Sequence, residues 1–558
     1  MAVSANSTAA APPAKEATGR RLRAQLVEHK RIITPVLVLA SLCVVTAISY
    51  GPYVSGGRFL ADDWANAGWT RFGGPGGIGT LDFFWQVTSF RPVLVLYVPA
   101  VHTVIGTDPA AHVVWSLVLA VAAAFALYVV LRQYRLPPLV AVLPAALVIP
   151  FPFAESIRLW TTASSVSLVV ALYLAGLALA LVALTSARRL AVLHLGSLIL
   201  YALSILMYEI TAPAVALSGL AYLVRVRSRA AVIRGVVDLG LAAALVVFVT
   251  TGGSRRSQDG SFDPTYLWDR FKLFGRQALS LLGASSLADL VHGKAVLGLV
   301  AIVILIGLVV VAVALRARFA QPSRLLLQQS CALSVAGLVV IVVGYLGFVP
   351  AASFYFPVAE GLTDRVNAGA AYGYAMVAAG LAFGIGALVA AVAKRPKWGA
   401  AIGALLGIVL LAGFIHGTRQ TEDRYIKAGE IQDQVMSVIR STVRHPPRGS
   451  LILAADYPVT TGQNIPSFAL SNDLQGAVRL AYGREDLGAL PLRSGVPVTC
   501  GRDGVHVGDA SSPDFVTLGP YGRTILVNVR TRRRVTVRTR AQCDAVRGAF
   551  PPGPDLAA

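Results

Sequence analysis

Charged residues are scarce in this chain of 558 residues. Asp, Glu, Lys and Arg make up only 14% of it, whereas they make up about 25% of ordinary soluble domains. Hydrophobic residues reach 55%, and the mean hydropathy is +0.66. This composition excludes an ordinary soluble domain, because too few polar side chains are present to cover a surface exposed to water. The sequence therefore predicts a polytopic membrane protein.

Cysteine is also rare, with four residues in the whole chain. Cys43 and Cys331 lie in apolar segments, and Cys500 and Cys543 lie in the polar C-terminal part. Four dispersed thiols are too few for a zinc framework, so no metal site is predicted. A structural disulfide between Cys500 and Cys543 is expected if that part lies outside the cytoplasm. No cofactor is predicted, and a divalent metal is left open.

Acidic residues are few, at 28 against 49 Lys and Arg, which gives a net charge of +21. Such an excess of positive charge suggests a nucleic-acid partner, and the positions of the charges along the chain test that hypothesis. Basic residues gather in an N-terminal arm and in five short clusters that contain no acid. The clusters are Arg132/Arg135, Arg188/Arg189, Arg225 to Arg234, Arg316 to Arg324 and Lys394 to Lys397. The segments between them alternate with balanced charge, which is the positive-inside pattern and argues against a nucleic-acid partner.

Apolar runs predict an all-α polytopic membrane protein of about eleven transmembrane helices. The predicted spans cover residues 32–50, 110–131, 137–153, 164–185, 191–207, 210–224, 235–252, 294–315, 325–347, 368–393 and 398–416. If residues 1–31 form a disordered basic arm in the cytoplasm, every basic cluster falls on the cytoplasmic side. Residues 92–106 are short for a span and contain Pro99, so an interfacial helix is expected there. The membrane domain is thus predicted over residues 32–416.

The C-terminal part, residues 417–558, is predicted to be a small extracytoplasmic α+β domain. A helical pattern after Gly417 extends the last span outward. The strand-like runs LILAA, VPVTC, TILVNV and RVTVR follow, with a helix expected near Asp473 to Tyr482. The basic run RTRRRVTVRTR is typical of a solvated hairpin face, and contact with anionic cell-wall polymer or lipid head groups is the alternative.

The first outer loop, residues 58–91, carries two adjacent carboxylates, Asp62 and Asp63, among aromatic residues. Aromatic rings suit a membrane–water boundary, where their bodies lie in lipid and their polar edges stay wet. Helix capping or plain solvent exposure also explains a pair of acids in a loop. The pair becomes a candidate site because the predicted topology puts it on the outer face.

Two further acids are candidates. Glu155 lies in FPFAESIRLW, where it either serves a site or pairs with Arg158 on one helical face. Glu209 lies in LMYEITAP, where two apolar spans meet at the outer side. An ionisable group near the membrane is a functional candidate, although a short outer turn also explains Glu209.

The first half of the chain resembles a known superfamily. The order of features, an acidic pair in a long first outer loop and an interfacial segment that opens with Arg-Pro, is similar to that of the C-fold glycosyltransferases. The segments SFRPVLVLYVPAVHTVIGTDPAAHVVWSLVLA and PAALVIPFPFAESIRLWTTASSVSLVVALYLAGL resemble the transmembrane O-mannosyltransferase-like branch. The likeness covers about residues 32–225, with Phe151-Pro152 in place of a His-Pro and Ser116 in place of an Asn. The tail lacks the helical repeats of that branch, so the acceptor is not implied.

The resemblance implies a sugar donor linked to a polyprenyl phosphate, and this chemistry assigns roles to the acids. Asp62 is expected to orient and deprotonate the acceptor hydroxyl, and Asp63 to shape the site or share that task. Glu155 matches the second-loop acid of the branch. Because two close carboxylates do not ionise independently, one of the pair is expected to have a raised pKa.

Cations on the outer side are candidates for the donor phosphate, because a guanidinium fork matches phosphate oxygens. Arg365 in EGLTDRVNAG is the first choice, and a pair with Asp364 or Glu360 is the alternative. His102 is a weaker candidate, since a lone histidine among apolar residues is more often a packing residue. The other candidates for substrate binding are Arg91, Arg158, Glu209, Lys272 and Arg276.

The predicted function is an integral-membrane glycosyltransferase of the bacterial plasma membrane, which moves a hexosyl or pentosyl group to an extracytoplasmic glycan, lipid or protein. A transporter or flippase of lipid-linked precursors is the rival hypothesis, but it would favour internal hydropathy repeats, and none is found. A non-catalytic assembly protein is the third hypothesis.

The positive-inside pattern predicts the side on which each segment lies. A reporter fused after Ala558 should be extracytoplasmic, and reporters fused at Arg189 or Lys397 should be cytoplasmic. Paired reporter fusions, one active only outside and one only inside, measure this directly. A cytoplasmic C-terminus would contradict the topology and, with it, the outer-face site.

Overall fold

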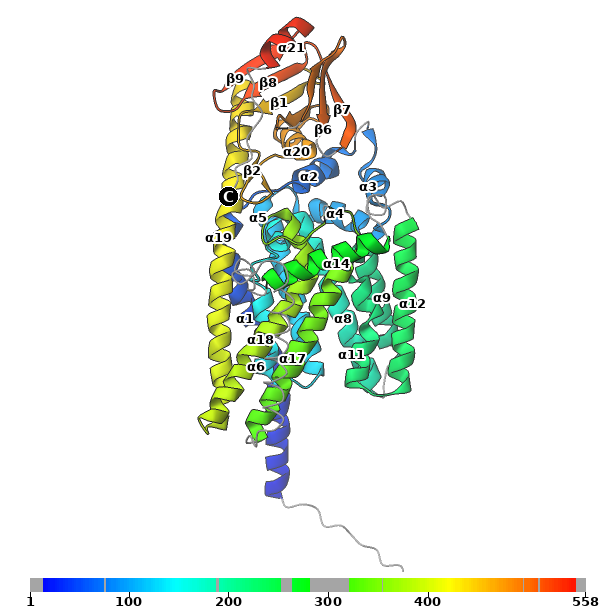
Figure 1. Cartoon of the computed structure of the whole chain (residues 1–558), viewed down its shortest axis with the longest axis vertical. Coiled ribbons are helices and arrows are strands. Elements are labelled where there is room, and N and C mark those ends of the chain that lie inside the picture. Colours follow the sequence, from blue (N-terminus) through cyan, green and yellow to red (C-terminus); the bar gives the residue numbers. More distant parts are fainter. Residues whose placement is uncertain are drawn as a thin grey trace, which may run out of the picture.

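The computed structural model describes residues 14–74, 77–186, 190–251, 263–281, 321–353, 355–494, 496–509 and 512–547. A bundle of long helices stands side by side, and a smaller domain of strands and helices lies beyond one end of it (Figure 1). The predicted fold class, a helical membrane protein with a small C-terminal α+β domain, is confirmed.

The helices follow the predicted apolar runs closely. In the first half they are α1 (Ala14–Gly56), α2 (Asp62–Phe72), α3 (Thr80–Thr88), α4 (Pro92–Ile105), α5 (Pro109–Gln133), α6 (Pro138–Val148), α7 (Ser156–Leu159), η2 (Thr161–Ser164), α8 (Ser165–Thr185) and α9 (Leu190–Met207). They continue with η3 (Glu209–Thr211), α10 (Ala212–Ala216), α11 (Ser218–Arg225), α12 (Arg229–Thr251), α14 (Pro264–Leu279), α17 (Gln321–Leu346), η5 (Leu362–Asn367), α18 (Ala368–Val392), η6 (Pro396–Trp398) and α19 (Gly399–Thr442).

Seven helices within the described residues are long and apolar enough to cross a membrane, and three shorter apolar helices accompany them. One of the three is α4, the expected interfacial helix, which runs across the outer end of the bundle rather than along it (Figure 1). The predicted span 294–315 lies outside the described residues.

Two predictions about local structure are wrong. The predicted disordered arm includes residues 14–31, but α1 already begins at Ala14. This stretch is rich in Ala, Arg, Leu, Glu and Gln, which are strong helix formers, so the helix of the first span extends into it. The predicted span 210–224 is interrupted, because α10 ends at Ala216 and α11 begins at Ser218.

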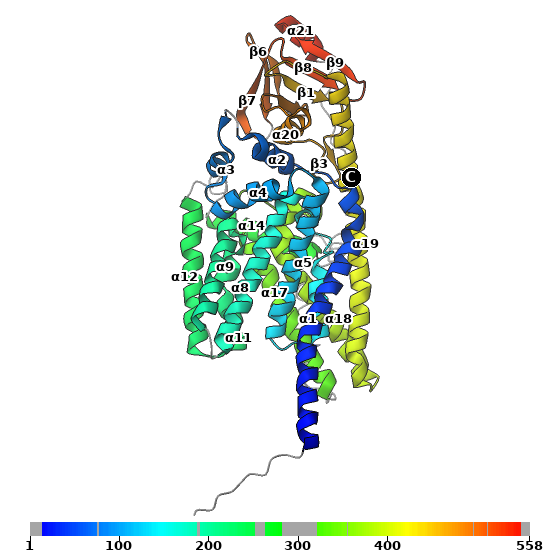
Figure 2. The ribbon, with the colours of Figure 1, turned by 180° about the vertical axis from the view of Figure 1, so that it is seen from behind.

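Helix α19 joins the bundle to the outer domain without a break. Its 44 residues continue past position 417, as the helical pattern there predicts. Figure 2 shows α19 running along the edge of the bundle and ending beside the strands. The predicted domain boundary therefore falls inside one continuous helix.

The outer domain is built on a four-stranded sheet in the order β4-β1-β8-β9. The strands are β1 (Leu451–Ala455), β2 (Thr460–Thr461), β3 (Ile465–Pro466), β4 (Gly488–Pro491), β5 (Val498–Cys500), β6 (Gly504–Asp509), β7 (Ser512–Pro520), β8 (Thr524–Asn528) and β9 (Arg533–Val537), and the helices are α20 (Ser471–Tyr482) and α21 (Arg540–Arg547). Strand β1 is parallel to β4 and β8, and β8 is antiparallel to β9. A second sheet, β5-β6-β7, is antiparallel.

The central strand β1 is apolar throughout because both of its faces are buried. Ile452 and Ala454 pack with α19 and α20, whereas Leu451 and Leu453 pack with the second sheet. On that second side the expected disulfide between Cys500 and Cys543 is confirmed, and it joins β5 to α21. The four strand-like runs and the helix near Asp473 to Tyr482 are also confirmed.

Helix α20 packs directly on α2, so the outer domain rests on the first outer loop. A Cβ on Gly476 would lie 2.2 Å from the carbonyl oxygen of Trp64, which shows how close the two backbones approach. The Trp64 indole N–H donates to Gln432 of α19, and Arg58 forms an ion pair with Asp433 of the same helix. The acidic loop is thus held between the bundle and the outer domain.

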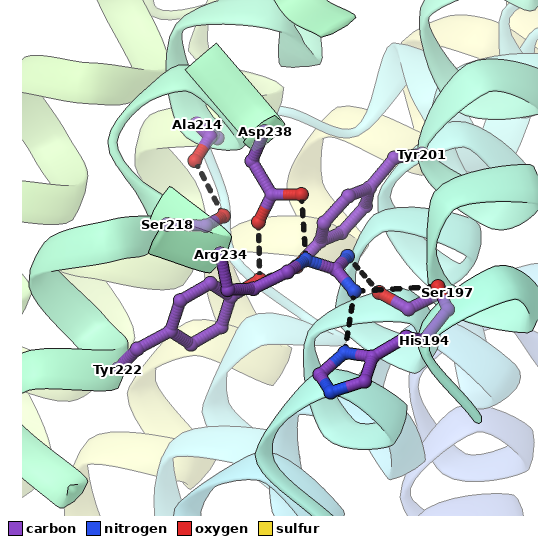
Figure 3. Close-up of polar contacts among 8 residues, drawn as sticks. All are labelled: His194, Ser197, Tyr201, Ala214, Ser218, Tyr222, Arg234 and Asp238. Atoms are coloured by element: carbon purple, nitrogen blue, oxygen red, sulfur yellow. Dashed lines mark hydrogen bonds and ion pairs between the residues drawn. The ribbon is translucent and has the colours of Figure 1, made fainter. Parts of the chain in front are cut away.

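A buried polar cluster joins α9, α11 and α12 inside the bundle. Arg234 pairs with Asp238 at 2.9 Å and donates to Ser197 and to a ring nitrogen of His194. The hydroxyl of Tyr222 donates to the other carboxylate oxygen of Asp238 at 2.6 Å. Figure 3 draws the cluster, which consists of His194, Ser197, Tyr201, Ala214, Ser218, Tyr222, Arg234 and Asp238. The charges of Arg234 and Asp238 are neutralised by each other, so the cluster fixes the helices relative to one another.

Candidate functional site

Three segments that the sequence predicts on the outer side converge at the end of the bundle next to the C-terminal domain. They are the start of α2, the segment from Ile149 to Ser164, and the segment that ends in η5. Helix α20 of the outer domain covers them from above (Figure 1). Asp62, Asp63, Glu155 and Arg365, which the sequence singles out, all lie at this meeting point.

Asp63 joins the first two of these segments. Its carboxylate is fully buried and accepts four hydrogen bonds, from the backbone N–H of Leu60, Thr161 and Thr162 and from the Thr162 hydroxyl. The bond to Leu60 spans Ala61, whose φ of +45° is rare for a residue with a Cβ. Burial raises the pKa of Asp63, and these hydrogen bonds oppose that rise. With its lone pairs engaged, Asp63 is suited to shaping the site rather than to accepting a proton from an acceptor.

Asp62 is the freer acid of the pair. It is partly exposed, and its one hydrogen bond among the described residues comes from the Asn472 side-chain amide, at 3.4 Å. Burial raises the pKa of Asp62, whereas the charge of Arg365 and the bond from Asn472 act to lower it. A carboxylate that is partly desolvated and weakly bonded is suited to take up a proton from a hydroxyl.

Arg365 holds its guanidinium against aromatic rings, and its charge acts on Asp62. The guanidinium carbon lies 4.8 Å from the ring centre of Trp160 and 5.6 Å from that of Tyr355. The alternative pairing with Asp364 or Glu360 is wrong, because Asp364 accepts from the Ser156 backbone and Glu360 pairs with Arg424. Arg365 has no ion pair or hydrogen bond within the described part of the chain, so its donors are available to an anion.

Glu155 and Asp364 form a fully buried pair of carboxyl groups below Arg365. The suggested ion pair of Glu155 with Arg158 is wrong. Arg158, only 2% exposed, instead donates to the carbonyl oxygens of Ala154 and Val148, because burial leaves those carbonyls without water. No donor in the described residues reaches either oxygen of Glu155, and its side chain lies within hydrogen-bonding reach of Asp364.

The net charge of Glu155, Asp364 and Arg158 determines how many protons the two carboxyl groups hold. The guanidinium of Arg158 stays charged, so two ionised carboxylates would leave a net negative charge in a site without water. One proton on the carboxyl pair makes the group neutral and supplies the missing hydrogen bond. Burial, and then the charge of Asp364, raise the pKa of Glu155 well above its ordinary value. Asp364 accepts from the backbone N–H of Ser156, so the buried pair joins η5, which carries Arg365, to the segment that carries Glu155.

His102 lies in a small pocket beside the Asp63 segment. Its ring packs on that of His112 with centroids 4.4 Å apart, and Phe59 covers both rings edge-on. The pocket is lined by Tyr97, Val98, Val101, His102, His112, Trp115, Thr161 and Thr162. The Nδ1 atom of His102 is buried and has no partner in the described residues. His102 therefore stays a candidate for contact with substrate, although its surroundings are mostly apolar.

Arg91 and Glu209 are brought together as a two-pronged ion pair. The Nε and Nη2 atoms of Arg91 donate to the two oxygens of Glu209 at 2.9 and 2.7 Å. The guanidinium also lies 4.1 Å from the ring centre of Tyr208. This pair joins the start of α4 to the turn between α9 and α10. Since Glu209 neutralises it, Arg91 is a weaker candidate for phosphate than Arg365.

Lys272 and Arg276 lie apart from the acids, on the exposed side of α14. Lys272 pairs with Asp269 at 2.8 Å on the same helix. The cation of α14 that faces inward is Arg270, which donates to the carbonyl oxygens of Phe348, Ala352, Ser353 and Tyr355. Arg270 thereby fixes the segment that leads to η5. Sequence reasoning missed it because an arginine in an amphipathic helix carries no signal of its burial.

Asn472 and Trp160 are the other site residues that the sequence did not reveal. Asn472 belongs to the outer domain and lies 410 positions from Asp62, so no local pattern links the two. Trp160 ends the motif FPFAESIRLW, in which only the ionisable residues Glu155 and Arg158 were predicted to belong to the site. Within the described ranges, no group of three or more His, Cys, Asp or Glu side chains is arranged to hold a metal ion.

Replacing Glu155 by Gln tests the protonated pair through stability. The folded protein holds a proton on Glu155 that the unfolded chain releases above the ordinary pKa of 4.5. Wild-type stability should therefore fall as pH rises from 4.5 towards the raised pKa of the folded state. Glu155→Gln has no proton to lose, so its unfolding temperature should fall less than that of the wild type as pH rises above 4.5.

The matched control is Glu430→Gln, because Glu430 is an exposed acid of α19 paired with Lys427. Its unfolding temperature should follow pH as in the wild type. Thermal unfolding of purified protein in detergent measures all three proteins. Parallel pH curves for Glu155→Gln and the wild type would contradict a protonated Glu155.

Comparison with known proteins gives only distant likenesses. No protein-family model matches the chain, and no curated protein matches it. Solved structures that resemble it include ArnT from Cupriavidus metallidurans bound to undecaprenyl phosphate, with 11% identity over 75% of this chain and 82% of that one and a TM-score of 0.38. The apo state of that ArnT has 14% identity over 75% and 81% of the two chains and a TM-score of 0.31.

A third likeness is to the Archaeoglobus fulgidus oligosaccharyltransferase tethered to an acceptor peptide. It has 12% identity over 77% of this chain and 62% of that one, and a TM-score of 0.37. At TM-scores below 0.5 these likenesses say nothing about the function of this chain.

Proposed function

We propose that this protein is an integral-membrane glycosyltransferase that moves a sugar from a polyprenyl-phosphate donor to an extracytoplasmic acceptor. The observation that carries the proposal is the meeting of Asp62 with Arg365. Asp62 begins α2 and Arg365 lies in η5, about 300 residues later, and both elements are hydrogen-bonded to the segment that contains Ser156 and Thr162. The charge of Arg365 acts to lower the pKa of Asp62. Both are partly exposed, so substrate has access to them.

Sugar transfer from a lipid phosphate needs a base for the acceptor hydroxyl and a cation for the phosphate, and the two must lie close together. Asp62 accepts the proton of the acceptor hydroxyl while the new bond forms between the acceptor oxygen and the anomeric carbon of the sugar. The bond from that carbon to the phosphate oxygen breaks, and negative charge develops on the phosphate. Arg365 stabilises this charge, because its fork reaches two phosphate oxygens at once.

The remaining residues hold this pair in place. Asp63 fixes the start of α2, on which Asp62 lies, to the second outer segment. Trp160 of that segment carries the guanidinium of Arg365, and Asp364 ties η5 to the backbone of Ser156. Asn472 extends the support to the outer domain. Such fixed geometry favours catalysis, because the reacting groups need no reorganisation.

The position of the site supports a lipid-linked donor. Helices α4 and α14 lie across the outer end of the bundle near the converging segments (Figures 1 and 2). An interfacial helix suits a substrate whose phosphate lies at head-group depth while its polyprenyl chain stays in the membrane. The disulfide supports the outer location of the C-terminal domain, since disulfides persist in oxidising compartments.

Asp62→Asn should abolish transfer while leaving folding largely intact. The amide keeps the size of the carboxylate but does not accept the hydroxyl proton, and such a base contributes about 10² to 10⁴-fold in rate. Transfer from a synthetic polyprenyl-phosphate sugar, measured with monodisperse protein in nanodiscs, gives the rate. Asp63→Asn is the comparison, and it should lower the unfolding temperature because an amide nitrogen replaces an acceptor of buried N–H groups.

If Asp62→Asn turned over normally while a well-folded Asp63→Asn were inactive, Asp63 would be the base and Asp62 the residue that shapes the site. Normal turnover by the double variant would remove the first outer loop from the chemistry. A transporter of lipid-linked precursors would then be the better hypothesis.

Arg365→Ala should weaken donor binding by about 1.5 to 3 kcal/mol, because a charge-assisted contact to phosphate is lost. Arg71→Ala is the matched control, since Arg71 is an exposed cation of α2 that lies near the Phe72 ring. Titration with a labelled polyprenyl-phosphate sugar gives both affinities. Equal affinity in Arg365→Ala and the wild type would place the phosphate elsewhere.

A further inference from the structure

An unneutralised arginine surface covers the end of the outer domain that is farthest from the bundle. Its six members lie at the end of α19, in the turn that follows, just before β8, on β9 and just after β9. We call them the distal arginine face: Arg440, Arg444, Arg448, Arg523, Arg534 and Arg538. Figure 1 shows the end of α19 and β9 together at the tip of the molecule.

Hydrogen bonds join the elements that carry these arginines. Arg534 of β9 donates to the carbonyl oxygen of Thr442 at the end of α19. The carbonyl oxygen of Arg523 accepts from the N–H of Leu451, next to the turn that follows α19. On β9, Val535 and Val537 pack towards the core on one face, so Arg534 shares the other face with Thr536. The face is therefore one surface rather than a set of scattered residues.

The charge of this face is not balanced by the domain. All six side chains are exposed, and none has an ion pair with a carboxylate in the described residues. Asp486 is the acid next to the turn, where it accepts a hydrogen bond from the N–H of Gly449. Its carboxylate forms an ion pair with Arg484 at 2.5 Å, so it does not neutralise the distal arginine face. Six like charges on a small surface repel one another, so an anionic partner would be favoured there.

Distance excludes the membrane in which the chain is anchored as that partner. From Gly417 to Arg440, α19 rises about 35 Å at 1.5 Å per residue. The field of a charged bilayer is screened within about 8 Å at physiological ionic strength. Anionic head groups at the foot of the domain therefore do not neutralise its tip.

We propose that the distal arginine face binds a linear polymer of the cell envelope that carries phosphodiester groups. The surface is open rather than enclosed, which suits an extended chain that contacts several arginines at once. All six residues are Arg and none is Lys, and the guanidinium fork is the group that pairs with two phosphate oxygens. The proposal requires the outer location of this domain but not the transfer reaction.

Binding of synthetic poly(glycerol phosphate) to the purified full-length protein tests this proposal. The variant is Arg444→Gln/Arg448→Gln/Arg538→Gln, which leaves Arg534 and its contact with Thr442 intact. The control is Arg71→Gln/Arg395→Gln/Arg502→Gln, which removes the same charge from exposed sites elsewhere. Fluorescence anisotropy of the labelled polymer, measured over a range of salt concentrations, gives affinity and salt dependence.

The distal variant should bind about tenfold or more weakly, and its slope of log affinity against log salt should fall by about 2 to 3. The control should bind as the wild type does. An equal loss in both triple variants, or no binding by the wild type, would overturn the proposal. Equal or tighter binding of polygalacturonate, a carboxylate polymer, would overturn the assignment to phosphate, and binding only to phosphatidylglycerol vesicles would overturn the assignment to a polymer.

Discussion

The carboxylate of Asp63 joins the first and second outer segments, and the rest of the candidate site depends on this contact. Its four hydrogen bonds satisfy backbone groups that would otherwise be buried without partners. They also stabilise the unusual backbone at Ala61, from which Asp62 projects. Because Trp160 lies in the same second segment, next to Thr161, the contact that places the acid also places the ring that carries Arg365. One buried acid thus fixes the segments that carry both partners of the proposed reaction.

Much of the fold could be predicted because two features of the sequence, long apolar runs and short strand-like runs, are easy to identify. Apolar length predicts the spans, and alternating or fully apolar short runs such as LILAA predict the strands. The acids and Arg365 could be found because ionisable residues are conspicuous among apolar ones. The contact of Asn472 with Asp62 could not be found, since it depends on how α20 packs on α2. The pairing of Glu155 with Arg158 looked reasonable at helical spacing, but α7 is only four residues long and unsatisfied carbonyls compete for the guanidinium.

The site contains two sets of charged groups, which differ in their exposure to water. Glu155, Asp364 and Arg158 form a group that one proton makes neutral, so it is stable where water is absent. Asp62 and Arg365 instead remain partly exposed and lack strong partners, so their charges are left for substrate. The enclosed neutral group thus differs from the open charged pair in its access to water.

The cluster of Arg234 and Asp238 has a consequence for the way in which the chain enters the membrane during synthesis. Asp238 alone would cost about 2.5 to 3.5 kcal/mol near the centre of an inserting helix, and Arg234 lies one turn before it, towards the start of α12. The partners of α12 all come from earlier in the chain, because His194, Ser197 and Tyr222 belong to α9 and α11. They are thus already present at the translocon when α12 arrives. Helix α12 is therefore a segment whose insertion relies on helices made before it, and the order of the sequence matches the order of assembly.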